Sequence, residues 1–217
     1  MTLGLPKANG AVSGTKAADL GKDKMLWLVK VFNIIGVRPL KSGLEKPIFL
    51  LGFPRSGTTI IFETLSMHED LAWFSNKLRQ HPKFPAVALF SRIAAFERLR
   101  GAEKQLVAQS PLQKYMPYPD ECYPVWERCC GERFLYDYLV GQRASAGERD
   151  RICKTIGSVV RFQGKKRFSA KITGPSRIEY LDSLFPDAVF VHILRDPRAV
   201  VNSLLRVRFW TRRGGYQ

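Results

Sequence analysis

The chain alternates between short apolar runs and segments with helical periodicity. Residues 47–53 form a nearly continuous apolar run bounded by proline and glycine, which is typical of a strand buried on both faces. A glycine-containing turn follows, and residues 58–67 have the pattern of a helix. A second apolar run at 188–194 predicts another buried strand, again followed by a helix. This order of strand, turn and helix is that of nucleotide-binding α/β folds.

The rest of the pattern predicts one domain. Helices are expected at residues 85–100, 132–140, 151–162, 175–185 and 197–206, and a short strand at 167–172. We therefore expect an α/β, P-loop-like three-layer fold, in which helices flank a central, mostly parallel sheet. Residues 1–21 are rich in Gly, Ala, Thr and Ser and are expected to be a flexible tail, so the domain spans 22–217.

The charge balance favours an anionic partner. The chain has 35 Lys and Arg against 19 Asp and Glu, a formal net charge of +16. This fits a nucleotide, nucleic acid, sulfated glycan or anionic membrane, or simply a well-solvated basic surface. The basic residues are not confined to one tract, so no specific nucleic acid is expected. Residues 22–37 can form an apolar helix face that either packs on the domain or contacts a membrane.

Cysteine and histidine usage further limits the class of protein that the chain can be. The four cysteines form no CxxC pair and there are only three histidines, so neither a zinc site nor a disulfide framework is expected. No apolar run is long enough to cross a bilayer, and residues 1–21 lack the pattern of a secretory signal. A reducing, cytoplasmic location is the simplest expectation.

Residues 54–59 carry the strongest chemical signal. A turn from strand to helix directs backbone N–H groups into one concavity, and the helix dipole favours an anion there. Gly57 lets the backbone approach that anion, Ser56, Thr58 and Thr59 offer hydroxyl groups, and Arg55 can fork onto two oxygens. A Walker A loop requires lysine where Thr58 stands, which weakens an ATPase or GTPase interpretation. A plain Ser/Thr-capped helix is the structural alternative.

A second segment offers a further anion site. Arg195 ends the predicted strand 188–194, and Ser203 follows eight residues later on the next helix, so the two can bracket a second phosphate. Alone this signal is weak, because Arg-Asp pairs at strand ends are often structural ion pairs. Asp196 can equally be an ordinary helix N-cap.

Together the two segments resemble the sulfotransferase superfamily. Pro-x-Ser-Gly-Thr-Thr after a buried strand is similar to its phosphosulfate-binding loop, and Arg195 and Ser203 match the pair that holds the 3′-phosphate of 3′-phosphoadenosine 5′-phosphosulfate (PAPS). Arg55 stands where cytosolic members usually have lysine, as in tyrosylprotein sulfotransferases and many bacterial members. The resemblance covers roughly residues 46–213, including Ala170-Lys-Ile-Thr-Gly-Pro175. It implies sulfuryl transfer from PAPS to a hydroxyl or amine, without a metal, and a family domain whose C-terminal part is missing here.

The resemblance also implies catalytic groups. Lys171, with Arg55, would balance charge near the sulfonate, although Lys171 can also be a solvated lysine on an edge strand. A base must take the acceptor proton, but residues 73–77, where that branch has its glutamate, contain no carboxylate. We favour Glu121, in the proline-bounded loop 118–124. The alternatives are Glu63, His68, Glu69, His81 and Asp120.

Other functions and several acceptors remain open. A P-loop kinase of small molecules would need Mg²⁺ and a loop lysine. A non-enzymatic binder of nucleic acid or sulfated glycan would use the net charge and show steep salt dependence. Under the sulfotransferase interpretation, the acceptor can be a carbohydrate, lipid, phenol or peptide hydroxyl.

Overall fold

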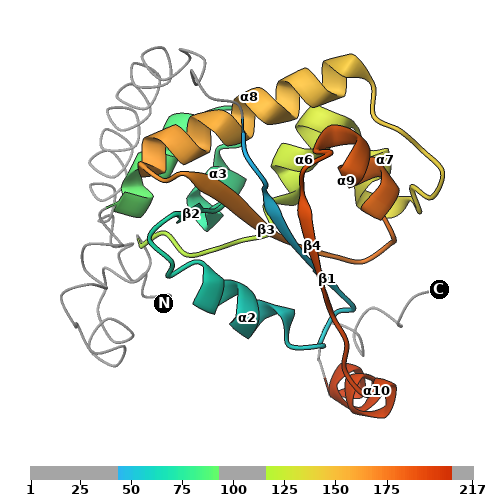
Figure 1. The fold of residues 1–217 in the computed structure, drawn as a ribbon. Helices are drawn as coiled ribbons and strands as arrows, with labels where there is room; N and C mark the ends of the chain where they lie inside the picture. The colour runs from blue at the N-terminus through green and yellow to red at the C-terminus, as the bar shows by residue number, and fades with distance from the viewer. Residues whose placement is uncertain (1–43, 93–115, 207–217) are drawn as a thin grey trace, which may run out of the picture.

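A parallel sheet lies at the centre of the protein (Figure 1). The computed structural model describes residues 44–92 and 116–206. Its strands are β1 (Ile48–Gly52), β2 (Leu71–Ala72), β3 (Arg167–Thr173) and β4 (Val189–Ile193), in the spatial order β2-β3-β1-β4. All adjacent strands in this sheet pair in parallel, so their carboxyl ends share one edge, where α/β folds bind ligands. The predicted α/β class with a mostly parallel sheet is confirmed.

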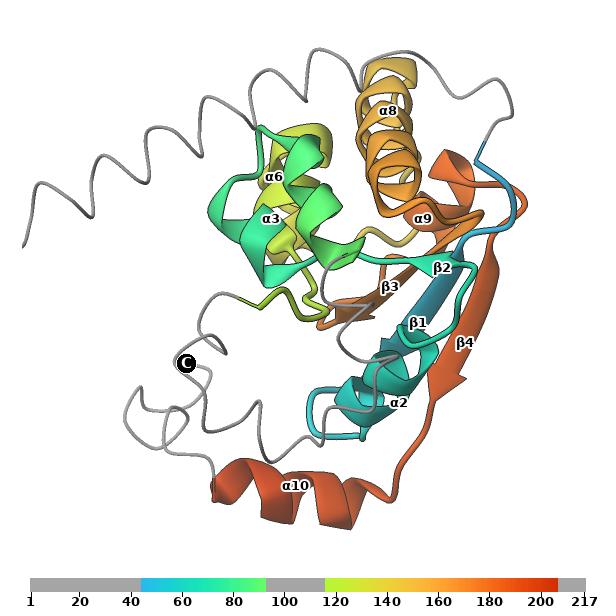
Figure 2. The same cartoon turned by 90° about the vertical axis from the view of Figure 1, so that its left-hand side faces the viewer.

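Helices cover both faces of the sheet (Figures 1 and 2). The covering helices are α2 (Thr58–Leu65), α3 (Asn76–Gln80), the 3₁₀ helix η1 (Pro85–Leu89), α6 (Tyr123–Cys130), α7 (Arg133–Tyr136), α8 (Ala146–Gln163) and α9 (Ile178–Leu184). Helix α10 (Pro197–Leu205) follows β4 and lies beyond the carboxyl end of the sheet. The alternation along β1 separates two layers: Phe49 and Leu51 join the large core under α6, α8 and α9. Leu50 points the other way and packs with Phe62 of α2.

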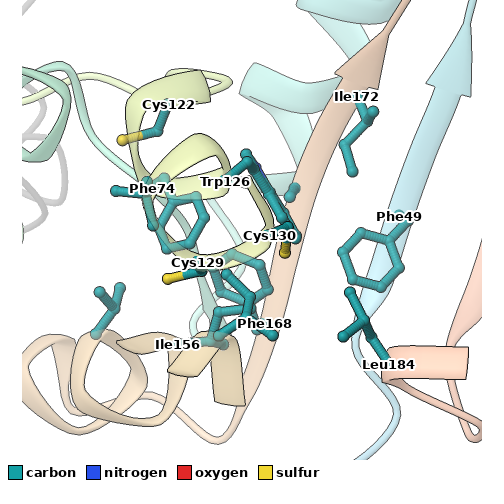
Figure 3. Close-up of a cluster of buried hydrophobic side chains, with 14 of the residues drawn as sticks. Phe49, Phe74, Cys122, Trp126, Cys129, Cys130, Ile156, Phe168, Ile172 and Leu184 are labelled. Atoms are coloured by element: carbon teal, nitrogen blue, oxygen red, sulfur yellow. The ribbon is translucent and has the colours of Figure 1, made fainter. Parts of the chain in front are cut away.

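The large core is rich in aromatic rings (Figure 3). Trp126 of α6 stacks on Phe134 of α7 with ring centroids 4.8 Å apart, and it makes an edge contact with Phe49 of β1 at a centroid distance of 6.2 Å. Phe74 packs against Phe168 of β3 at 4.7 Å. This cluster holds α6 and α7 against the sheet, and α6 begins directly after the loop that contains Glu121.

Strand β4 is not the buried strand that the apolar run predicted. It lies at the edge of the described sheet and pairs only with β1 there, with Val189 and Val191 42% and 37% exposed. An apolar run indicates a strand, but its pattern does not reveal how many neighbours that strand has. The short strand predicted at 167–172 is β3, and it lies between β2 and β1 rather than at the edge that the alternative interpretation of Lys171 assumed. Lys171 therefore belongs to an interior strand.

The predicted helix at 132–140 is wrong beyond Tyr136. Asp137 is extended, with φ −92° and ψ 150°, and the Leu139 N–H donates to the carbonyl of Ser176 instead of to a helical partner. The buried guanidinium of Arg177 also donates hydrogen bonds to the backbone carbonyls of Phe134 and Leu135. Tertiary contacts with the β3–α9 loop therefore end this helix early.

Other helices begin at residues different from those predicted. Helix α8 begins at Ala146, five residues before the predicted start, because Ser145 and Glu148 form a capping box. Helix α9 begins at Ile178 rather than at 175. The helix predicted at 85–100 starts as a 3₁₀ turn, and its residues 93–100 lie outside the described ranges, as do residues 1–21 and 22–37. Strand β2 and helices α3 and α6 were not predicted.

Candidate functional site

The predicted anion-binding loop at residues 54–59 (the anion loop) lies at the carboxyl end of β1 and leads into α2. Arg55 and Gly57 both have positive φ, 70° and 93°, and the Ser56 N–H bonds the Phe53 carbonyl at 3.1 Å. This tight turn directs the chain into α2, whose first N–H groups have no partner inside the helix. Of the residues predicted to offer hydroxyl groups, Thr59 is exposed and Thr58 is buried, and the Ser56 hydroxyl donates to the Phe53 carbonyl at 2.6 Å.

Gly52 explains how the turn fits so closely beneath α2. A Cβ at this position would lie 2.7 Å from Cγ2 of Thr58, 3.0 Å from Oγ of Ser56 and 3.1 Å from the backbone oxygen of Ile193. No side chain can be accommodated there without displacement of the loop or of β4. The end of β1 therefore supports the loop by close backbone approach.

The second predicted segment contacts the loop directly. The Arg55 side chain donates from Nε to Oγ of Ser203 at 3.0 Å, and Nη1 of Arg195 donates to the Arg55 carbonyl at 3.0 Å. The structure thus brings together three predicted site residues that are up to 148 positions apart. Asp196 caps α10 through the Arg198 N–H and pairs with the Arg198 side chain at 2.9 Å. The N-cap alternative for Asp196 is confirmed, and its ion pair is with Arg198.

Lys171 and Glu121 form an ion pair beside the loop. Nζ of Lys171 lies 2.9 Å from Oε1 of Glu121 and 3.0 Å from Oγ1 of Thr59. The side chains of Lys171 and Glu121 are only 14% and 21% exposed. Lys171 therefore links the base candidate Glu121 to Thr59, the second residue of α2. The alternative of a solvated Lys171 is wrong.

The sequence analysis missed three residues that fix this pair. Oγ1 of Thr173 donates to Oε1 of Glu121 at 3.0 Å, and the Tyr123 hydroxyl donates to the Thr173 carbonyl at 2.6 Å. The guanidinium of Arg177 bonds the same carbonyl at 3.1 Å. Burial, and then the charge of Glu121, raises the pKa of Tyr123, which therefore stays protonated. The strand's ending in Thr-Gly-Pro was the available signal, because a threonine at the carboxyl end of a parallel strand faces the ligand edge.

The other base candidates lie elsewhere or are already engaged. Asp120 accepts from the Cys122 N–H and lies 3.5 Å from the Arg79 guanidinium. The backbone carbonyls of His68 and Glu69 accept from Lys165, just before the amino end of β3, whereas Lys171 lies near its carboxyl end.

Glu63 and His81 lie on different helices. Glu63 is an exposed residue of α2, and His81 caps the end of α3. Among the candidates, Glu121 is the carboxylate that contacts the Lys171 ammonium.

Three further features bear on ligands. Within residues 44–92 and 116–206, no group of three or more His, Cys, Asp or Glu side chains is placed to hold a metal ion. In the same ranges, no helix is long and apolar enough to span a bilayer. An open hollow of about 430 Å³ lies on α10, lined by Pro197, Arg198, Val201, Asn202 and Leu205, and it includes none of the predicted site residues.

The fold and the loop define an α/β protein with an anion loop at the carboxyl end of β1, and comparison with known proteins identifies its family. The model of the sulfotransferase family matches residues 47–217. The chain therefore belongs to the sulfotransferase family, as the sequence resemblance implied.

Individual known proteins are similar to the chain over part of their length. The chain is 29% identical over 172 residues to the nodulation protein NoeE of Sinorhizobium fredii, a match that covers 75% of this chain and 32% of NoeE. Sulfotransferase STF9 from Mycobacterium avium matches with a TM-score of 0.51 and 22% identity, over 84% of this chain and 50% of STF9. Sulfotransferase STF1 from Mycobacterium tuberculosis matches with a TM-score of 0.43 and 19% identity, over 70% of this chain and 46% of STF1. The chain thus spans about a third of NoeE and half of STF9.

Proposed function

We propose that this chain binds PAPS and transfers its sulfuryl group to a hydroxyl or amine acceptor. The observation that carries the proposal is the direct contact between the two anion-binding segments, from Arg55 to Ser203 and from Arg195 back to Arg55. A ligand with two anionic groups can bridge segments that are this close. PAPS has such groups at its 5′ and 3′ positions, whereas AMP and ATP lack the 3′-phosphate.

Each segment has a distinct role in donor binding. The N–H groups at the start of α2, with Gly57, Thr58 and Thr59, would hold the 5′-phosphosulfate, as anions bind at helix N-termini. Arg195 and Ser203 would hold the 3′-phosphate. Arg55 belongs to the first segment and contacts Ser203 of the second, so its guanidinium can donate paired N–H groups to both anionic ends of PAPS. Ser56 would shape the loop, because its hydroxyl donates within the turn.

The chemical step needs a cation and a base at one place. The acceptor oxygen or nitrogen attacks the sulfur, the bond from sulfur to the 5′-phosphate oxygen breaks, and the acceptor proton passes to Glu121. Lys171 would stabilise the charge that develops on the departing phosphate, which becomes that of adenosine 3′,5′-bisphosphate. Lys171 and Thr173 both contact Oε1 of Glu121. Among the described residues Oε2 makes no hydrogen bond, and it is the oxygen we assign to the proton.

Two rival functions fit the site less well. A small-molecule kinase would need a lysine in the loop, and Thr58 stands at that position. A non-enzymatic binder of nucleic acid or sulfated glycan explains the charge of +16, but it gives no role to a carboxylate paired with Lys171 beside the anion loop.

We also propose a reducing, cytoplasmic location, supported by four free cysteine thiols. Carbohydrate, lipid, phenol and peptide hydroxyls are the acceptors to test.

The test follows the labelled sulfuryl group of PAPS across a panel of those acceptors. We expect label in an acceptor together with an equal amount of adenosine 3′,5′-bisphosphate. Lys171→Met should remove most of that turnover, whereas Lys154→Met, at an exposed lysine of α8, should not. Transfer of the γ-phosphate of ATP, with no transfer from PAPS, would instead establish the kinase.

A further inference from the structure

One ammonium group contacts both a carboxylate and a hydroxyl of the anion loop. Lys171 contacts the Glu121 carboxylate at 2.9 Å and the Thr59 hydroxyl at 3.0 Å, and Thr59 belongs to the loop proposed to take the donor. Both charged side chains are largely withdrawn from solvent, so their interaction is stronger than that of a fully exposed pair. The same ammonium therefore faces an internal carboxylate and the donor site.

We propose that Glu121 is an internal counter-ion that competes with the anionic oxygens of the donor for Lys171. This inference rests on the proposed function, because it requires an anionic donor at the loop. In the competition, the carboxylate weakens donor binding, and the donor in turn draws the ammonium away from the carboxylate. The coupling is reciprocal: the free energy by which Glu121 weakens donor binding equals the free energy by which the bound donor weakens the ion pair.

The neighbouring charges do not replace either partner. The N–H groups of Arg177 are engaged by backbone carbonyls, including those of Phe134 and Thr173, which hold its guanidinium in place. The carboxylate of Asp120 lies beside Arg79 and the Cys122 N–H. The competition we propose therefore involves Lys171 and Glu121 rather than Arg177 or Asp120.

The consequence is a coupling between donor binding and release of the base. The flexible four-carbon stem of lysine allows Nζ to turn from Glu121 toward an oxygen bound near Thr59. Glu121 then keeps its hydrogen bond from Thr173, which holds Oε1 in position while the ammonium is shared with the donor. The donor then shares the ammonium that pairs with Oε1, while Oε2 of the same carboxylate takes the acceptor proton.

The experiment measures binding of adenosine 3′,5′-bisphosphate by isothermal titration, so it needs neither an acceptor nor turnover. We expect Glu121→Gln to tighten binding by about threefold to fivefold, the scale of one partly exposed ion pair. The matched control is Glu63→Gln, which removes the same charge from an exposed position of α2 and should leave affinity unchanged. Glu121→Ala is the second variant should Glu121→Gln fail to fold.

A Lys171→Met background separates competition from general repulsion. There, the gain from Glu121→Gln should be clearly smaller, because the shared ammonium is gone. An equal gain in both backgrounds, or no gain in the native background, overturns the inference while the proposed donor stands. If the native protein does not bind adenosine 3′,5′-bisphosphate at all, the proposed function itself fails, and the inference fails with it.

Discussion

Replacing Gly52 by alanine tests whether close packing beneath the loop shapes the donor site. The new Cβ would lie 2.7 Å from Cγ2 of Thr58, whereas ordinary contacts begin at 3.4 Å, so the groups must separate by about 0.7 Å. The backbone oxygen of Ile193, at 3.1 Å, limits movement toward β4. Overpacking of this kind costs about 1–3 kcal/mol, or roughly 2–12 °C in Tm for a chain of this size. Because the displaced residue begins α2, we also expect at least a tenfold loss of nucleotide affinity, the scale of one charge-assisted hydrogen bond.

The assay combines thermal unfolding with titration of adenosine 3′,5′-bisphosphate. Gly131→Ala is the control: Gly131 has φ +84°, lies at the end of α6 outside the anion loop, and has no atom within 4 Å of the position that an alanine methyl group would take. This variant should lower Tm through backbone strain, on the order of 1–3 kcal/mol, and leave affinity intact. If Gly52→Ala keeps the native Tm, the close packing is not as described. If it loses stability but binds nucleotide normally, the loop is not the donor site.

Two further predictions concern the anion site and the scaffold. Arg55→Ala and Arg195→Ala should each weaken binding of adenosine 3′,5′-bisphosphate by about 1.5–3 kcal/mol without unfolding the protein, and loss of the fold in either variant would show a structural role. Burial tends to raise the pKa of Glu148, but hydrogen bonds from Ser145 and Arg133 outweigh it and hold this pKa below its usual range. The stabilisation is therefore present above the ordinary glutamate pKa of about 4.3 and is lost as pH falls through the lower folded-state value. In urea unfolding, Glu148→Gln should be less stable than the native protein near neutral pH, with a smaller difference at about pH 3; an equal difference at both pH values would contradict this account.

The sequence predicted the parts of the site that depend on local geometry. The loop at 54–59 and the Arg195–Ser203 pair each follow a strand, and a strand followed by a helix positions such residues without information from elsewhere in the chain. The proline-bounded loop and the family resemblance also singled out Glu121 and Lys171 separately. Their contact was not predictable, because it depends on β3 pairing with β1 and on α6 packing through Trp126.

The sequence also contains local signals for two helix starts that were overlooked, whereas the early end of α7 and the exposure of β4 have no local signal. The Ser145–Glu148 capping box marks the start of α8 in the sequence itself, and Pro124 lies in the first turn of α6. The early end of α7 could not be anticipated, because it depends on a guanidinium forty-odd residues away, that of Arg177. The exposure of β4 was likewise hidden, since an apolar run reads the same at the edge of a sheet as at its centre.

The most direct test of the central claim compares how nucleotides stabilise the protein against thermal unfolding. Adenosine 3′,5′-bisphosphate at about a hundred times its Kd should add roughly 2.7 kcal/mol. AMP, which lacks the 3′-phosphate, and ATP with Mg²⁺ should each add much less at the same concentration. Arg195→Ala should abolish the advantage of the bisphosphate over AMP. Equal stabilisation by AMP and the bisphosphate, or stronger stabilisation by ATP with Mg²⁺, would contradict the account.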